Sequence, residues 1–309
     1  MERIKLGRSG LEVSPVCFGC WQMGGSYWGE VDEDALGRAV HRAVEVGVNF
    51  FDNADAYGDG AAESRLGRFI EDIDREKLVI ATKVYHHWLE EPGSKRVPDL
   101  SYDYIIEECE ASLRRLGIDH VDLYQAHAVD QFTHLEETTR AFDKLKRDGK
   151  IRAYGLSNYS GHALQAALAL GDYDTVQPPY NLMRRGIEGD VLPICLANDL
   201  GVLCYGALHK GMLTGKFDGT ETFDDLRSRM DDFQGERFRR NVEAVEQMRP
   251  IAEKLGKSVT QLALRFVLDH PAVHCAIVGI KNAAQIEDAA GAMGWSLGRE
   301  DYYDLRRLF

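Results

Sequence analysis

Several features are scarce in this sequence of 309 residues. Its six cysteines are too few for the disulfide framework of a small secreted protein. No stretch approaches the roughly 20 apolar residues of a membrane-spanning helix, and no apolar run of the signal-peptide type follows residues 1–5. Basic residues are outnumbered, since 37 Lys+Arg face 50 Asp+Glu. The formal net charge of −13 disfavours nucleic-acid and anionic-membrane partners, and we expect a cytoplasmic protein.

Domain-boundary signals are also missing. There is no Pro/Ser-rich linker, block of like charge or short sequence repeat. Apolar side chains make up 44% of the residues and charged ones 28%, which is close to the average of globular proteins. A chain of this length can bury roughly 75% of its unfolded surface. The sequence therefore predicts a single domain over residues 1–309.

Short apolar runs alternate with helical patterns along the chain. The runs occupy residues 15–19, 48–52, 78–83, 121–127, 151–157, 175–177, 202–205 and 274–279. Such near-continuous runs are typical of parallel strands that are buried on both faces. The helical patterns include residues 34–46, 104–116 and 135–146, each followed closely by a glycine. Eight strand–helix units in a chain of this length predict an α/β fold of the (β/α)8 TIM-barrel type, with a doubly wound sheet as the alternative.

Three segments are additional to this repeating pattern. Residues 3–13, with a Ser9-Gly10 turn, predict an N-terminal hairpin that closes the bottom of the barrel. Residues 209–235 form a long loop after strand seven, and residues 299–308 predict an extra C-terminal helix.

Two pairs of potential metal ligands do not make a convincing metal site. Cys17 and Cys20 have CxxC spacing, but no second pair completes a zinc site. His86 and His87 are neighbours at a predicted strand end, so their side chains face opposite ways. We predict no metal site.

Polar side chains follow the predicted strands at the points where they end. In a TIM barrel the active site lies at these carboxyl ends. A carboxylate, an ammonium and an imidazole, from Asp52, Lys83 and His127, then converge on one mouth, a combination typical of an enzyme active site.

Six segments, in order along the chain, resemble the motifs of aldo-keto reductases. They are FDNADAYG (51–58), SRLG (64–67), ATK (81–83), LYQAH (123–127), GLSN (155–158) and GMLTGK (211–216). The segment YGAL (205–208) resembles a bacterial subgroup that includes general-stress reductases. The resemblance runs from the opening hairpin to about residue 302, and so covers nearly the whole chain.

The resemblance implies an oxidoreductase that reduces an aldehyde or ketone to an alcohol with NAD(P)H and without a metal. The catalytic tetrad falls on Asp52, Tyr57, Lys83 and His127. Tyr57 would supply the proton as a general acid, because a carbonyl that accepts a hydride becomes an alkoxide. A nearby Lys83 ammonium lowers the phenol pKa, and Asp52 keeps that ammonium charged. His127 would hydrogen-bond the carbonyl oxygen of a small-molecule substrate.

The resemblance also assigns the binding residues. The nicotinamide carboxamide is implied to be held by Ser157, Asn158 and Gln177, with Tyr205 stacked on the ring. The pyrophosphate is implied to be lined by Gly206, Leu208, Gly211, Lys216 and Arg227. The adenosine end is implied to be surrounded by Gly279, Lys281, Gln285 and Asp288. NADPH is preferred because Lys281 can meet a 2′-phosphate and no acidic residue lies in segment 279–285. Candidates for a substrate wall are Trp21, Tyr27, Trp28 and Trp88.

Two other functions remain open at this point. A cofactor-binding regulatory subunit with little turnover, similar to potassium-channel β subunits, shares the resemblance, although the chain has no long N-terminal extension. A barrel lyase could use Lys83 as a Schiff-base nucleophile, but it would leave Tyr57, Asn158 and Tyr205 without a role.

Overall fold

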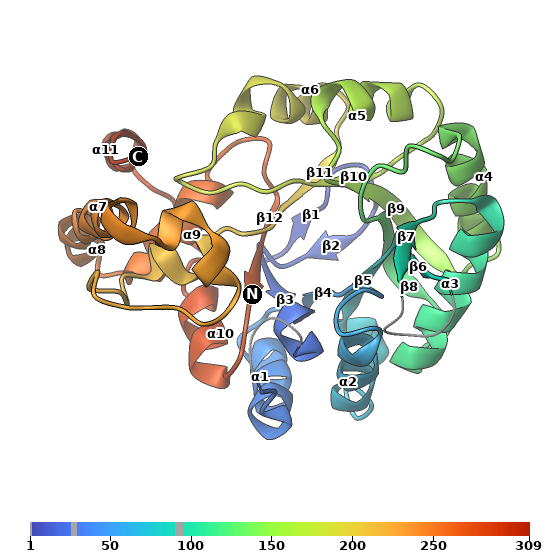
Figure 1. Cartoon of the computed structure of the whole chain (residues 1–309), viewed down its shortest axis with the longest axis horizontal. Coiled ribbons are helices and arrows are strands. Elements are labelled where there is room, and N and C mark those ends of the chain that lie inside the picture. Colours follow the sequence, from blue (N-terminus) through green and yellow to red (C-terminus); the bar gives the residue numbers. More distant parts are fainter. Residues whose placement is uncertain (1, 26–29, 90–94) are drawn as a thin grey trace.

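Eight parallel strands form a closed barrel in the computed structural model of the chain, which describes residues 2–25, 30–89 and 95–309 (Figure 1). They are β3 (Val16–Gly19), β4 (Phe50–Asp52), β5 (Val79–Val84), β8 (Val121–Ala126), β9 (Ile151–Ser157), β10 (Thr175–Gln177), β11 (Gly201–Cys204) and β12 (Cys275–Gly279). The last strand, β12, pairs in parallel with the first, β3. The closed sheet confirms the predicted (β/α)8 barrel and rules out the doubly wound alternative, which would leave two open edges.

Helices surround the barrel (Figure 1). They are α1 (Glu33–Glu45), α2 (Ala61–Phe69), α3 (Tyr102–Leu116), α4 (Leu135–Arg147), α5 (Gly161–Leu168), α6 (Val191–Ala197), α7 (Gly235–Glu246), α8 (Arg249–Leu255), α9 (Val259–Leu268), α10 (Ala283–Ala290) and α11 (Arg299–Arg307). The first is typical: the Asp32 side chain caps α1 by accepting a hydrogen bond from the Ala35 N–H. Its buried stripe includes Leu36, Val40 and Ala43, at the spacing of one helix face. The helix α11 is the predicted C-terminal extra helix.

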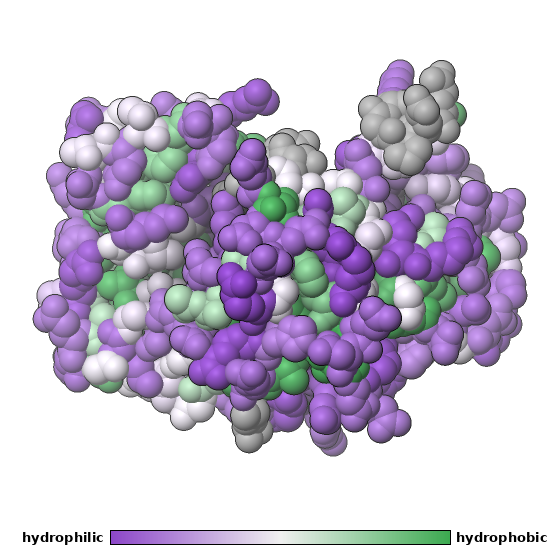
Figure 2. All heavy atoms as spheres, turned by 90° about the horizontal axis from the view of Figure 1, so that it is seen from below, coloured by the Kyte–Doolittle hydropathy of each residue, from purple (hydrophilic) through white to green (hydrophobic). Residues whose placement is uncertain are grey.

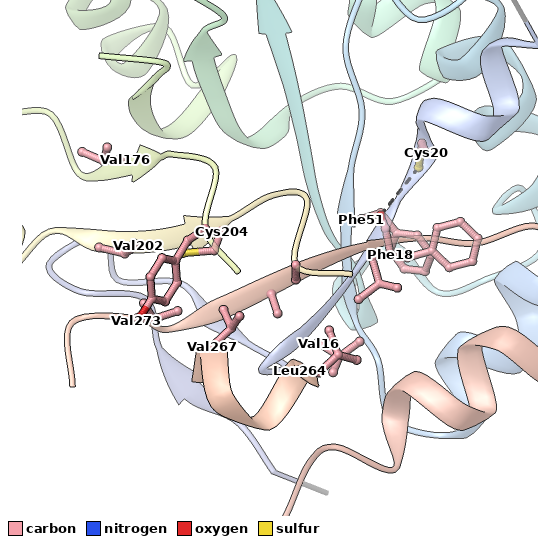
Figure 3. Packing of buried hydrophobic residues seen from close by; sticks show 14 of the residues in the cluster. Val16, Phe18, Cys20, Phe51, Val176, Val202, Cys204, Leu264, Val267 and Val273 are labelled. Atoms are coloured by element: carbon pink, nitrogen blue, oxygen red, sulfur yellow. Dashed lines mark hydrogen bonds between the residues drawn. The ribbon is translucent and has the colours of Figure 1, made fainter. Parts of the chain in front are cut away.

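The hydrophobic core has two layers, because successive strand residues point to opposite sides of the barrel wall. Val16 and Phe18 of β3 point outward, and Figure 3 shows Val16 beside Leu264 of α9. Between them, Cys17 points inward and packs with Phe50 and other residues of the barrel interior. A regular alternation of this kind places every second residue near the carboxyl end of a strand inside the mouth of the barrel.

A small N-terminal hairpin closes the opposite end of the barrel, as predicted. Its strands are β1 (Ile4–Lys5) and β2 (Glu12–Val13), and Leu6 and Leu11 are buried among the interior residues. Gly7 has a φ of +49° and lies so close to β11 that a Cβ would be 2.2 Å from the Gly201 nitrogen. The hairpin therefore blocks access from the amino ends of the strands and leaves the carboxyl ends open.

Two insertions lie at the carboxyl ends. The predicted long loop after β11 contains the 3-10 turns η4 (His209–Thr214), η5 (Leu226–Arg229) and η6 (Asp231–Phe233). A second hairpin, β6 (His86–Trp88) paired with β7 (Arg96–Pro98), was not predicted from the sequence. Its strands have three residues each, too short for a clear alternating pattern.

One face of the molecule is largely polar (Figure 2). Figure 2 shows this face, on which hydrophilic residues cover most of the area and hydrophobic ones form only small patches. In the part of the chain that the structure describes, no helix is long and apolar enough to cross a membrane.

Candidate active site

A buried lysine is the centre of the predicted tetrad. Lys83 lies on β5 and is fully buried. Its Nζ donates hydrogen bonds to Asp52 Oδ2 at 2.9 Å, to the Asn53 carbonyl oxygen at 2.6 Å and to Tyr57 OH at 3.3 Å. Asp52 ends the neighbouring strand β4, so strand pairing brings the carboxylate and the ammonium together. The structure thus brings three of the four tetrad residues into direct contact.

Tyr57 lies in the turn between β4 and α2. The next residue, Gly58, has a φ of +62°, and a Cβ there would be 2.2 Å from the Gly24 carbonyl oxygen. Glycine is needed at this position because of both the backbone conformation and the close approach of the chain. The Tyr57 ring lies between two others, with centroids 6.2 Å from Trp21 and 5.9 Å from His127. The turn therefore holds the phenol over the mouth of the barrel.

Burial governs the protonation of the tetrad. Burial raises the pKa of Tyr57 to about 12, although the positive charge of Lys83 acts in the opposite direction. The sign of the Lys83 effect agrees with the expectation from the sequence, but that expectation did not include burial, which is the larger effect. Burial alone would lower the pKa of Lys83, yet Asp52 and Tyr57 hold it above its usual value, so the ammonium stays charged.

His127 follows β8 and completes the tetrad. Its backbone N–H donates to the Val84 carbonyl oxygen at 3.0 Å, and its own carbonyl oxygen accepts from Asn158 Nδ2 at 2.8 Å. Burial, with the charges of Lys83 and His86, lowers the pKa of His127 well below its usual value. A neutral imidazole has one N–H donor, which suits a carbonyl oxygen at this place.

A cavity of about 650 Å³ opens from the tetrad. This volume is in the range of sites for small molecules and cofactors. Asp52, Tyr57 and His127 line it, while Lys83 is buried behind them. All the predicted cofactor-binding residues line it too: Ser157, Asn158, Gln177, Tyr205, Gly206, Leu208, Gly211, Lys216, Arg227, Gly279, Lys281, Gln285 and Asp288. One continuous surface therefore joins the tetrad to every one of these positions.

Amide side chains form the part of the cavity next to the tetrad. Gln177 Nε2 donates a hydrogen bond to Asp52 Oδ1 at 2.8 Å, which fixes the orientation of the carboxylate that pairs with Lys83. Asn158 has a φ of +62°, a conformation that asparagine tolerates better than most residues. Its Oδ1 accepts from Tyr205 OH at 2.7 Å, and its Nδ2 also donates to Ser157 Oγ at 3.2 Å. These bonds link the ends of β9, β10 and β11 to the predicted catalytic groups.

Basic side chains form the far part of the cavity. Arg227 makes a two-pronged hydrogen bond to the Asp225 carboxylate, at 3.0 and 2.6 Å, and lies 4.5 Å from the centroid of Phe223. Burial, together with the charges of Arg227 and Lys281, lowers the pKa of Lys216. These neighbouring cations favour an anion, in a chain whose net charge is −13.

The end of the cavity that the sequence assigns to adenosine is formed by β12 and α10. The Gln285 side chain accepts a hydrogen bond from the Lys281 backbone N–H at 2.8 Å. Asp288 accepts from Ser258 Oγ at 2.6 Å, which ties α10 to α9. Both acceptors therefore shape this end of the cavity through contacts within the protein.

Some lining residues were missed and some predicted ones lie elsewhere. Lys210 lines the cavity and has a φ of +54°. In the sequence it lies between Leu208 and Gly211, two residues predicted to bind the cofactor, and this position could have identified it. Further lining residues that were missed are Gln22, Thr214 and Thr260.

Of the predicted substrate wall, Trp21 lines the cavity, whereas Trp88 of β6 does not and instead packs with its ring 3.9 Å from the Arg96 guanidinium. Tyr27 and Trp28 lie outside the described residues. Within the described ranges, no group of three or more His, Cys, Asp or Glu side chains could hold a metal ion.

Comparisons with known proteins give one consistent family. Residues 15–308 match the model of the Aldo/keto reductase family. Aldo-keto reductase YhdN of Bacillus subtilis (strain 168) is 36% identical over 312 residues, which cover 100% of this chain and 93% of the relative. The NADH-specific methylglyoxal reductase of Escherichia coli (strain K12) is 30% identical over 321 residues, which cover 100% of this chain and 98% of the relative.

A solved structure agrees with this result. The glycerol dehydrogenase AKR11B4 from Gluconobacter oxydans superposes with a TM-score of 0.92 and 37% identity, covering 99% of this chain and 94% of that one. The chain therefore belongs to the aldo/keto reductase family and is an oxidoreductase of carbonyl and alcohol groups.

Proposed function

We propose that the protein reduces an aldehyde or ketone to an alcohol with NADPH. The observation that carries the proposal is the buried Lys83 ammonium, 3.3 Å from Tyr57 OH and 2.9 Å from the Asp52 carboxylate, at the head of a cavity that ends in cations. A Schiff-base lyase is disfavoured, since that chemistry needs a neutral amine and Asp52 keeps this one protonated.

The donor set of the cavity fits a nicotinamide dinucleotide. Ser157, Asn158 and Gln177 would hold the carboxamide, because an amide needs both donors and acceptors. Tyr205 would support the nicotinamide ring. The segment from Gly206 to Gly211, with Lys210, Lys216 and Arg227, would bind the pyrophosphate. Lys281, Gln285 and Asp288 would surround the adenosine. When bound, the cofactor supplies the hydride.

The tetrad supplies the proton and the stabilising charge. His127 donates its single N–H to the carbonyl oxygen and, with Tyr57 OH, orients that oxygen in the mouth. As negative charge develops on the oxygen, the Tyr57 hydroxyl transfers its proton there. The phenolate left behind is stabilised by the Lys83 ammonium, which Asp52 and Gln177 hold in place. Alcohol oxidation uses the same groups in reverse, with the phenolate as base.

The direct test is the decrease of absorbance at 340 nm when the protein is given NADPH and a panel of aldehydes, ketones and sugars. We expect turnover with at least one of them. Tight NADPH binding without turnover on any carbonyl would instead support a cofactor-binding regulatory subunit.

Cofactor choice gives a sharper prediction. Lys281→Ala should weaken NADPH binding by about ten- to a hundredfold, the contribution of one charge-assisted hydrogen bond, and leave NADH almost unaffected. Lys281 lines the adenosine end, and its charge also lowers the pKa of Asp225, a carboxylate that Arg227 already neutralises. One relative is named as NADH-specific, so both cofactors should be titrated by protein fluorescence.

The matched control is Lys77→Ala. Lys77 precedes β5 at the amino end of the barrel, and its side chain is 66% exposed. Its removal changes the net charge equally and should affect neither cofactor. Equal losses of NADPH and NADH in Lys281→Ala would show that Lys281 shapes the loop rather than binding the phosphate.

A further inference from the structure

A second histidine lies beside the catalytic one. The ring of His86, on β6, is centred 5.9 Å from the ring of His127 and meets it edge-on at 70°. It extends a row of rings formed by Trp21, Tyr57 and His127. The hairpin that carries it lies next to the carboxyl ends of β5 and β8 (Figure 1). His86 is thus placed just beyond the group that orients the carbonyl oxygen.

The hairpin holds His86 in this place through its backbone and its neighbours. Tyr104 OH donates to the His86 carbonyl oxygen at 2.7 Å, and the Tyr85 ring is centred 4.9 Å from the His86 ring. No described residue hydrogen-bonds to the ring nitrogens of His86, although the side chain is partly buried. The ring nitrogens of His86 are not among the buried polar atoms that lack a partner, so solvent or a ligand can reach them. A polar ring that is held in place beside a reaction centre and has accessible nitrogens is suited to bind part of a ligand.

His87 makes the contrast clear. Its ring stacks on Tyr104 with centroids 4.2 Å apart, and its Nδ1 pairs with Asp99 Oδ2 at 2.8 Å. The two neighbouring histidines therefore point to opposite sides of β6, as expected from the sequence. The side chain of His87 has partners within the protein, whereas that of His86 faces the catalytic histidine.

We propose that His86 is a specificity-determining residue that hydrogen-bonds a hydroxyl group on the carbon next to the substrate carbonyl. This inference rests on the proposed function. His86 does not line the cavity around the tetrad itself but lies on the far side of His127. With the carbonyl oxygen at Tyr57 and His127, a substituent on the adjacent carbon that points toward His127 would extend in the direction of this ring. Burial and the charge of Arg96 lower the pKa of His86, so it is neutral near pH 7. Neutral imidazole has one donor and one acceptor, as a hydroxyl does.

Two aldehydes that differ by a single hydroxyl test the proposal: 2-hydroxypropanal and propanal, each reduced with NADPH. His86→Phe keeps a ring but removes both nitrogens. It should lower kcat/KM for 2-hydroxypropanal by about three- to tenfold, the effect of one neutral hydrogen bond, and leave propanal nearly unchanged. His86→Asn, which keeps a donor and an acceptor, should restore part of the preference. His87→Phe is the matched control and should leave the ratio of the two substrates at the wild-type value.

Each other result contradicts the proposal. An equal loss on both aldehydes in His86→Phe would show that His86 only supports His127, and an unchanged ratio would show that it does not contact the substituent. The same fall in the ratio in His87→Phe would assign the effect to the hairpin as a whole. If the wild-type protein consumes no NADPH with any carbonyl, the proposed function itself fails, and the role of His86 with it.

Discussion

Replacing Tyr57 by phenylalanine is expected to lower kcat for carbonyl reduction by about 10²–10⁴-fold, the usual contribution of a general acid. The ring would keep its contacts with Trp21 and His127, so only the hydroxyl at 3.3 Å from Lys83 Nζ is lost. NADPH affinity should stay nearly unchanged, because the hydroxyl acts on the substrate oxygen. Single-turnover kinetics at 340 nm and a fluorescence titration with NADPH measure the two effects separately.

Tyr303→Phe provides the matched control for this substitution. Tyr303 lies on α11, is 47% exposed and takes no part in the cavity, so its variant should keep full activity. If Tyr57→Phe retains more than a tenth of wild-type turnover with chemistry rate-limiting, another group supplies the proton. A large loss of NADPH affinity would instead show that Tyr57 shapes the cofactor site.

The barrel and its mouth could be predicted because local patterns determine them. Each strand is a short apolar run, and closure of the sheet places all carboxyl ends on one side. Asp52 and Lys83 therefore had to meet once their strands paired. The same logic applies to Gln177, which ends β10 and reaches Asp52 across the barrel, although the sequence positions differ by 125 residues.

What could not be predicted depends on contacts between distant segments. Burial outweighs Lys83 in the pKa of Tyr57, and part of that burial comes from the packing of the turn against the 3-10 segment that contains Trp21 and Gly24. Trp88 was assigned to the substrate wall as an aromatic residue on a loop near the predicted mouth, but the β6–β7 hairpin places it against Arg96. His86 was considered only as a metal ligand, because nothing in the sequence shows that β6 runs beside His127.

Lys83→Met is expected to destabilise the fold as well as the reaction. Lys83 is fully buried and Asp52 is only 2% exposed, so removal of the ammonium leaves a buried carboxylate without its counter-charge. Breaking a buried pair in this way costs about 3–5 kcal/mol of unfolding free energy. The double variant Lys83→Met/Asp52→Asn removes that charge and should recover part of the loss in denaturant unfolding. A single variant as stable as the wild type would show that Asp52 takes up a proton or finds another partner.

The pH dependence of alcohol oxidation tests the chemical role of the same lysine. Oxidation needs the Tyr57 phenolate, so its rate should rise with pH toward the phenol pKa, which burial raises to about 12 despite Lys83. In Lys83→Met the ammonium is absent, so the pKa of Tyr57 rises further and the rising limb of the pH–rate profile should move to higher pH. The rate of oxidation at a given pH should then fall, by about tenfold if the limb moves by one pH unit. The Asp52 charge also raises the phenol pKa, so the double variant should move the limb part of the way back. An unmoved limb in Lys83→Met would contradict electrostatic control of Tyr57 by Lys83.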